Sequence, residues 1–354
     1  MKKNICIIGA FDFMDMNSDG QTVKTRELYY SLCKQYGENN ITYIETFGWK
    51  NKPFKILKEM YKNVKRCNIF IMLPAHNGVE VFSRLLVFCK KYKDIQIFYD
   101  VIGGWLPEKT KKHPRLLKYL KYFDGIWVET SSMLCALNKQ GLNNIYVLPN
   151  YKNLNILSEQ ELENNYLIPF KVCTFSRVIE KKGIEDAIEA INKVNKDLNT
   201  IVFHLDIYGP IGDSFSKKFE ELKKNNRDVI SYKGVISPSE SVNILKDYYA
   251  LLFPTRFYTE GIPGTIIDAY ASGVPVITTL WQNYQDIFVE GSTGWGYDFG
   301  DQEEFVKVLK KAAQYSDEFL KMKPSCLKAA WKYHSNTVIK QIDKLIRDVD
   351  LDGC

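Results

Sequence analysis

The stretch that decides the fold is Thr259–Ile277, which reads TEGIPGTIIDAYASGVPVI. Glu260 precedes a Gly-Ile-Pro-Gly turn, and Asp268 follows eight positions later, after an apolar run that predicts the first turns of a helix. Gly273 and Pro275 are expected to end this helix and to open a strand. The first N–H groups of a helix bind phosphate, and carboxylates accept hydrogen bonds from sugar hydroxyls. The stretch therefore combines a helix start that can bind an anion with two carboxylates that can accept hydrogen bonds from hydroxyl groups.

Outward from this stretch, short apolar runs alternate with helical segments in two series, separated by the polar residues 151–166. The predicted strands of the first series are Ile5–Ile8, Ile41–Ile44, Ile69–Leu73, Ile95–Tyr99, Ile126–Val128 and Ile145–Leu148; those of the second are Val172–Phe175, Val202–Tyr208, Val229–Tyr232, Leu251–Phe253 and Val274–Ile277. Such alternation predicts α/β architecture with two doubly wound parallel sheets and a cleft between them. Ligands of such sheets bind at the carboxyl ends of the strands.

The composition is that of a globular chain long enough for two domains, with 354 residues, 45% hydrophobic and 25% charged. No run of 18 apolar residues occurs, so no transmembrane helix is expected, and the apolar run Ile5–Gly9 predicts a first strand rather than a signal peptide. The eight cysteines are scattered without a Cys-x-x-Cys pair, which disfavours a disulfide framework or a zinc site. These features predict a cytoplasmic protein.

Glu260, seven residues and then Asp268 resemble the Glu-x7-Glu signature of the retaining family 4 glycosyltransferases of the GT-B fold. Asp268 departs from that signature by one methylene, which alters its reach but keeps its charge. The resemblance extends over essentially the whole chain and is strongest over residues 171–280. It implies two Rossmann-like domains facing a central cleft: an acceptor-side domain at 1–160, a nucleotide-sugar donor domain at 161–325, and a C-terminal helix at 326–354 that returns to the first domain.

The segment SRVIEKKG at 176–183 follows a predicted strand and opens a helix. Arg177 and Lys182 stand five positions apart, where a bidentate guanidinium and a point charge can converge on a diphosphate. In the family the corresponding Arg and Lys hold the donor pyrophosphate. The resemblance implies that they stabilise the departing nucleoside diphosphate without a metal ion or other cofactor, while Glu260 positions the donor sugar and Asp268 holds the ribose.

Further binding positions follow from the same resemblance. On the donor side these are Gly209, Ile236, Gly261, Ile262, Pro263, Gly264 and Thr265, and on the acceptor side Gly103 and Trp105. Gly20 and Gln21 are expected to approach both donor and acceptor, and His76 is expected to contact either the acceptor or the donor sugar. Gly209 follows a predicted strand, and Ile236 is expected against the nucleotide base. The family has a glycine pair where this chain has Asp19-Gly20, so the close approach of backbone to ligand depends on Gly20 alone.

Charge is unevenly distributed: residues 1–150 carry 23 Lys and Arg against 13 Asp and Glu, a net of +10, and the remainder has a net of −4. Basic clusters lie at 50–65, which contains six lysines, at 90–93 and at 109–115. One interpretation is solvated helix faces, and the other is peripheral, salt-sensitive contact with the anionic inner face of a membrane. The clusters match no nucleic-acid-binding module, so nucleic acid is not an expected partner.

The function predicted from the resemblance is transfer of a hexose from a nucleotide sugar, with UDP as the expected carrier. The expected acceptor is a hydroxyl of a growing surface polysaccharide or of a lipid-linked saccharide. Two alternatives remain open: a non-catalytic carbohydrate- or nucleotide-binding scaffold of an assembly complex, and a sugar-nucleotide epimerase of the same fold.

Overall fold

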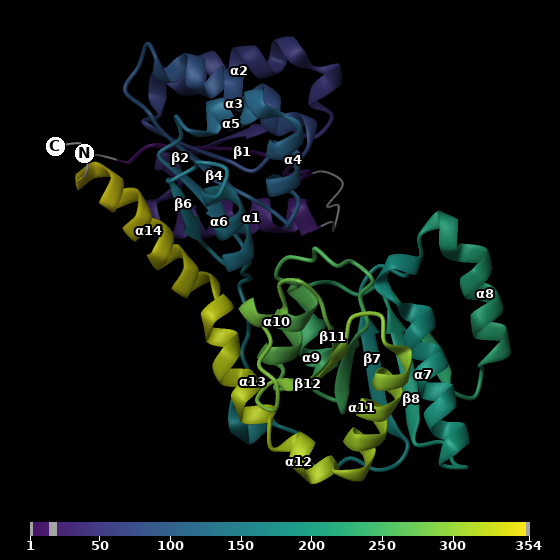
Figure 1. Cartoon of the computed structure of the whole chain (residues 1–354). Helices are drawn as coiled ribbons and strands as arrows, with labels where there is room; N and C mark the ends of the chain where they lie inside the picture. Colours follow the sequence, from purple (N-terminus) through teal and green to yellow (C-terminus); the bar gives the residue numbers. More distant parts are fainter. Residues whose placement is uncertain (1–2, 14–19, 352–354) are drawn as a thin grey trace. The chain divides into compact units, whose positions relative to one another are not determined.

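The computed structural model describes residues 3–13 and 20–351, and its chain forms two α/β units (Figure 1). One unit runs up to Asn153 and includes the residues from His334 on, and the other comprises Leu154–Tyr333. Among the described residues, no helix is both long enough and apolar enough to cross a bilayer.

The first unit is built on a six-stranded sheet in the order β2-β1-β3-β4-β5-β6, with every neighbouring pair parallel. Its strands are β1 (Ile5–Gly9), β2 (Ile41–Glu45), β3 (Ile69–Met72), β4 (Gln96–Asp100), β5 (Gly125–Val128) and β6 (Ile145–Val147). Its helices are α1 (Gly20–Tyr36), α2 (Pro53–Arg66), α3 (Asn77–Lys90), α4 (Leu106–Lys112), α5 (Pro114–Leu120), α6 (Ser131–Asn138) and α14 (Ser335–Leu351).

Both faces of this sheet are covered, which explains why β1, β3 and β5 are buried along their whole length. Helices α2 to α6 share one apolar core with the sheet, and α1 and α14 share the core on the other face. Ile339, Ile342 and Ile346 of α14 are buried in that second core, as the apolar stripe of the C-terminal segment predicts.

The second unit repeats the architecture with the sheet order β12-β11-β10-β7-β8-β9, again all parallel. Its strands are β7 (Phe170–Phe175), β8 (Phe203–Tyr208), β9 (Ile230–Gly234), β10 (Ala250–Phe253), β11 (Val276–Leu280) and β12 (Gly294–Asp298). Its helices are α7 (Ile184–Asp197), α8 (Ser216–Asn225), α9 (Ser241–Leu245), α10 (Gly264–Ala271), α11 (Gln302–Gln314), α12 (Ser316–Leu320) and α13 (Lys323–Ala330). Helices α7, α8, α11 and α12 contribute to the core on one face, and α9, α10 and α13 to the core on the other.

The predicted α/β class with two doubly wound sheets is confirmed, but two local expectations were wrong. Strand β12 was missed because its sequence, Gly-Trp-Gly-Tyr-Asp, resembles a turn. The C-terminal helix expected at 326–354 is interrupted, since α13 ends at Ala330 and α14 begins at Ser335. Between the two helices, His334 forms an isolated parallel β-bridge with Lys152, and the N–H of Ser335 donates to the Lys152 carbonyl.

Two glycines with positive φ fix close packing at the carboxyl edge of the second sheet. A Cβ at Gly183 would stand 1.8 Å from the carbonyl oxygen of Pro254, and one at Gly209 would stand 1.9 Å from that of Ser176. No side chain fits at either position, so the loops after β7, β8 and β10 are locked together. These are the loops that carry the candidate site.

Candidate active site

Helix α10 begins with backbone N–H groups that donate no hydrogen bond to another described residue. Its N-cap is Pro263, which offers no side-chain cap, and the first backbone amides to find carbonyl partners are those of Ile266 and Ile267. Among the hydrogen bonds of the described residues, none uses the N–H of Gly264 or Thr265. The hydroxyl of Thr265 is also buried, and it has no hydrogen-bond partner among the described residues. Buried polar groups are rarely left unpaired, so this helix start has the character of an anion site.

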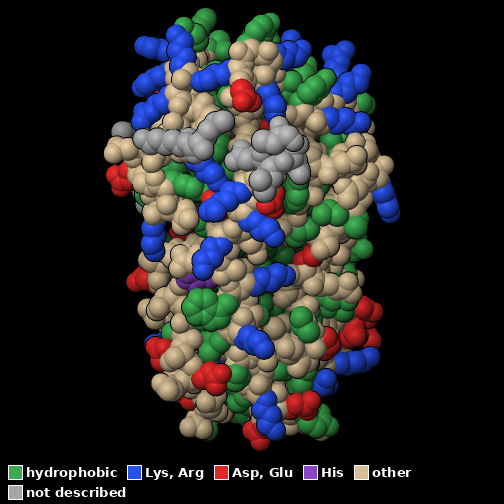
Figure 2. All heavy atoms as spheres, turned by 90° about the vertical axis from the view of Figure 1, so that its left-hand side faces the viewer, with side chains coloured by type: hydrophobic (Ala, Val, Ile, Leu, Met, Phe, Trp, Pro, Cys, Tyr) green, Lys and Arg blue, Asp and Glu red, His purple; other side chains and the backbone are tan. Residues whose placement is uncertain are grey.

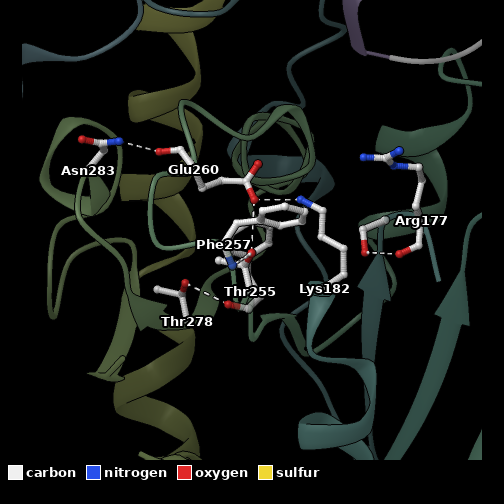
Figure 3. Close-up of polar contacts among 9 residues, drawn as sticks. Arg177, Lys182, Thr255, Phe257, Glu260, Thr278 and Asn283 are labelled. Atoms are coloured by element: carbon white, nitrogen blue, oxygen red, sulfur yellow. Dashed lines mark hydrogen bonds and ion pairs between the residues drawn. The ribbon is translucent and has the colours of Figure 1, made fainter. Parts of the chain in front are cut away.

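Lys182 and Glu260 form an ion pair immediately before this helix. The Lys182 ammonium lies 2.8 Å from Oε2 of Glu260, and their side chains are only 13% and 20% exposed. The lysine comes from the 3₁₀ turn Glu180–Lys182 that precedes α7, and it lies over the rings of Phe253 and Phe257 at 5.6 and 5.1 Å. Figure 3 shows the two charged ends pointing toward each other.

Residues of two loops hold Glu260, one at its carboxylate and the other at its backbone carbonyl. The Thr255 hydroxyl donates to Oε2 of Glu260 at 3.1 Å, and the Asn283 amide donates to the Glu260 carbonyl at 2.6 Å (Figure 3). The backbone N–H of Phe257 in turn donates to the Thr255 hydroxyl. The side chain and the backbone of Glu260 are therefore both held, and the contacts of the carboxylate with Lys182 and Thr255 are both made by Oε2.

Arg177 stands apart from this pair. Arg177 lies just beyond β7 and is exposed to solvent. Among the described residues, its guanidinium takes part in no ion pair. In Figure 3 its side chain extends beside the Lys182–Glu260 pair without contacting it. An unpaired guanidinium at the carboxyl end of a parallel strand is available to an anionic ligand.

The other predicted donor-side residues lie around the same sheet edge. Gly261, Ile262 and Pro263 are buried in the turn before α10, and Asp268 is buried one turn into the helix. Gly209 follows β8 and accepts a hydrogen bond from the Tyr232 hydroxyl at 2.9 Å.

Ile236 lies two residues beyond β9 and packs against the core that contains α10. The structure thus gathers the donor-side positions of the sequence analysis on one unit, and their binding roles stay predictions.

In the first unit, two of the predicted binding residues meet. His76 precedes α3 with a φ of 48°, and its ring centroid lies 5.0 Å from that of Trp105. Gly103 has a φ of 76°, and the Trp105 indole N–H donates to the Ile102 carbonyl at 2.8 Å. These contacts form a small aromatic surface after β3 and β4.

Gly20 and Gln21 form the start of α1, where Gly20 is exposed and Gln21 half-buried. Asp19, which stands where the family has the first glycine of its pair, lies outside the described residues. The binding roles of these residues remain predictions.

A buried charge cluster near this surface was missed by the sequence analysis. The Lys24 ammonium of α1 lies 2.8 Å from Asp100 and 3.5 Å from Glu129, and all three side chains are at most 3% exposed. Burial raises the pKa of the Asp100 carboxyl, and the neighbouring Lys24 only partly offsets this. Asp100 ends β4, and the Lys24 ammonium also reaches the Val101 carbonyl at 3.4 Å. The cluster therefore anchors α1 to β4, the strand that precedes Gly103 and Trp105.

Comparison with known proteins finds a family match in the second unit. Residues 159–324 match the family model described as "Glycosyl transferases group 1". The matched stretch contains Arg177, Lys182, Glu260 and all of α10. Residues 159–324 are thus similar to a group 1 glycosyltransferase domain.

Curated relatives of this chain are named for polysaccharide biosynthesis. AmsK of Erwinia amylovora, an amylovoran biosynthesis glycosyltransferase, is 22% identical over 233 residues, which cover 63% of this chain and 55% of AmsK. The matched part spans about half the length of the curated relatives.

Solved structures establish the fold over the whole chain. Anabaena HepE in complex with UDP superposes with a TM-score of 0.75 at 12% identity, covering 98% of this chain and 100% of HepE. The lipopolysaccharide outer core galactosyltransferase WaaB, in its apo form, gives a TM-score of 0.70 at 17% identity, covering 97% and 99%. The predicted GT-B fold is thereby confirmed.

The second unit positions its charged side chains with residues that the Glu-x7-Glu signature does not contain. Thr255, Phe257 and Asn283 orient Glu260 and Lys182, and none of them was singled out from the sequence. Thr255 lies two residues beyond the apolar strand β10, and a polar residue close to that strand end was the available signal. Among the described residues, no group of three His, Cys, Asp or Glu side chains could hold a metal ion.

Proposed function

We propose that the chain is a retaining, metal-independent glycosyltransferase that moves a hexose from a nucleotide sugar, with UDP as the expected carrier. The proposed acceptor is a hydroxyl of a growing surface polysaccharide or of a lipid-linked saccharide. The observation that carries the proposal is the open N-terminus of α10, with its unused amides and the unpaired Thr265 hydroxyl, next to the Lys182–Glu260 pair.

The proposed mechanism begins with charge on the leaving group. When the bond between the anomeric carbon and the diphosphate breaks, the electron pair stays on the phosphate oxygen. The Lys182 ammonium, the Arg177 guanidinium and the α10 amides would stabilise that charge from fixed positions. Lys182 is paired with Glu260 before a ligand binds, and it can contact carboxylate and phosphate together because an ammonium has three donors.

Glu260 has a separate role in the proposed reaction. Its oxygen not engaged by Lys182 would accept hydrogen bonds from the donor sugar, and its charge favours the oxocarbenium-like state. The acceptor hydroxyl would attack from the face that the diphosphate leaves, and the leaving phosphate would take the hydroxyl proton. Asp268 would hold the ribose hydroxyls.

The polymer acceptor is supported by two observations. AmsK is named for amylovoran biosynthesis and WaaB for the lipopolysaccharide outer core. In this chain the His76–Trp105 pair offers an aromatic surface on the first unit, and sugar rings stack on such surfaces through their C–H faces.

Release of nucleoside diphosphate is the assay that tests the proposed activity. A thermal-shift panel of UDP-, GDP- and ADP-sugars first identifies the donor, because a ligand of the folded state raises the melting temperature. With that donor we expect diphosphate release only when a saccharide acceptor is added, at a rate that EDTA leaves unchanged. Binding without turnover would favour a scaffold, and conversion of the donor sugar without an acceptor would favour an epimerase.

Thr265→Val tests whether α10 binds the donor. The substitution removes a buried hydroxyl that has no partner in the described chain, so the unliganded protein should be as stable as the wild type or more so. Donor affinity should fall by about 0.5–1.5 kcal/mol, the usual net contribution of one hydrogen bond. Calorimetric titration measures the affinity and thermal unfolding the stability. Unchanged affinity would remove Thr265 from the donor site.

A further inference from the structure

Helix α2 has an apolar stripe on the side that faces away from the protein. Its inward side chains Ile56 and Met60 are buried in the core of the first unit. On the outward side Phe54, Leu57 and Tyr61 are 85%, 50% and 65% exposed. The spacing of three and then four residues places these three side chains on one line along the helix.

Cations border this stripe. Lys55, Lys58, Lys62 and Lys65 are exposed, and none of them takes part in an ion pair among the described residues. The Lys65 ammonium lies 4.1 Å from the centre of the Tyr61 ring, so charge and apolar surface are in direct contact. In Figure 2 lysine and arginine side chains gather over the first unit with apolar side chains between them.

The end of α3 extends the same surface. The Lys93 ammonium contacts the Val64 carbonyl, which places the carboxyl ends of α2 and α3 side by side. There Phe88 and Tyr92 are 59% and 77% exposed, and their ring centroids lie 5.0 Å apart. The surface therefore combines five large exposed apolar side chains with several exposed cations.

We propose that α2, together with the end of α3, docks onto an anionic lipid bilayer. Phe54, Leu57 and Tyr61 would enter the boundary between headgroups and acyl chains, while the lysines contact lipid phosphates. A second copy of this chain fits the surface poorly, because it would bring lysines against lysines. Nucleic acid phosphates would satisfy the cations but leave Phe54 and Leu57 exposed to water.

This proposal changes the salt dependence predicted from charge alone. Attachment by lysines only is screened by salt, whereas insertion of apolar side chains is not. We therefore expect the wild type to bind vesicles made of equal parts of phosphatidylglycerol and phosphatidylcholine, and to bind vesicles of phosphatidylcholine alone only weakly. Part of the binding to the mixed vesicles should remain at high salt. Co-sedimentation measures the partition coefficient and requires no enzymatic turnover, so its outcome is independent of the proposed function.

Two matched variants separate the contributions. Phe54→Ser/Leu57→Ser/Tyr61→Ser should lower the partition coefficient at least tenfold and abolish the salt-resistant part. Lys58→Gln/Lys62→Gln/Lys65→Gln should lower it roughly 100-fold at low salt. The controls change similarly exposed residues of the other unit, Leu167→Ser/Leu198→Ser/Tyr315→Ser and Lys217→Gln/Lys224→Gln, and should bind as the wild type does.

Insertion itself is tested with Phe54→Trp. Lipids brominated on their acyl chains should quench this variant more strongly than the wild type, because only an inserted ring reaches the bromine atoms. Equal quenching of the two proteins, binding to neither kind of vesicle, or the same loss of binding in the control variants would overturn the proposal. If the protein binds no vesicles but is retained on a nucleic acid column, and the Phe54→Ser/Leu57→Ser/Tyr61→Ser variant is retained equally, the cations would be assigned to nucleic acid instead.

Discussion

Replacing Lys182 by methionine should lower turnover by about 100- to 1,000-fold, the usual effect of removing one fixed donor to a developing charge. Donor affinity should fall by about 1.5–3 kcal/mol, the contribution of a hydrogen bond to a charged group. Methionine retains the packing between Phe253 and Phe257 while removing the ammonium. The Glu260 carboxylate keeps its hydrogen bond from the Thr255 hydroxyl, so loss of Lys182 should change the fold little. Steady-state kinetics and calorimetric titration of the donor measure the two effects.

Lys181→Met is the matched control for this prediction. Lys181 is the neighbouring cation, it is exposed, and it lies 5.4 Å from the Phe257 ring without reaching Glu260. We expect its turnover to stay within about threefold of wild type, since exposed charges contribute little. Equal losses in both variants would mean that general positive charge, rather than the Lys182–Glu260 pair, carries the activity.

Lys24→Met should destabilise the first unit by about 3–5 kcal/mol, because it leaves Asp100 and Glu129 as buried carboxylates without their cation. The loss should depend on pH in a defined direction. The pKa of Asp100 is already raised by burial, so the folded variant binds protons more tightly than the unfolded chain. Its stability should therefore fall as pH rises through the folded-state pKa, and the deficit should be larger at neutral than at mildly acidic pH.

Urea unfolding of the wild type and the variant at several pH values measures this effect. Lys34→Met, at an exposed lysine of the same helix, should cost little at any pH. The double variant Lys24→Met/Asp100→Asn should recover part of the stability, because it removes one buried charge. A deficit that is independent of pH and not relieved in the double variant would show that Lys24 contributes by packing alone.

The sequence was informative wherever a local pattern determines the structure. The strand–helix alternation predicted both sheets, and the turn at Gly261–Gly264 predicted the start of α10. Arg177, Lys182 and Glu260 were found because each stands beside a strand end or a helix start. The parallel sheet then brings these separate loops to one edge.

What the sequence did not reveal depends on contacts between distant segments. Lys24 is one lysine among many, and only the structure shows that α1 buries it against β4 and β5. The lysines between positions 50 and 65 were visible as charge, but the exposure of Phe54, Leu57 and Tyr61 depends on which side of α2 faces the core. Thr255 and Asn283 contact Glu260 through loops whose geometry no spacing encodes.

The central claim is that a nucleoside diphosphate binds between Arg177, Lys182 and the N-terminus of α10. Calorimetric titration tests it most directly, with UDP, GDP and ADP as ligands for the wild type and for Arg177→Ala/Lys182→Met. We predict that one of these diphosphates binds the wild type, that its nucleoside alone does not, and that the double variant loses at least 100-fold in affinity while remaining folded. Binding of the diphosphate with equal affinity to the wild type and a folded double variant would contradict the account.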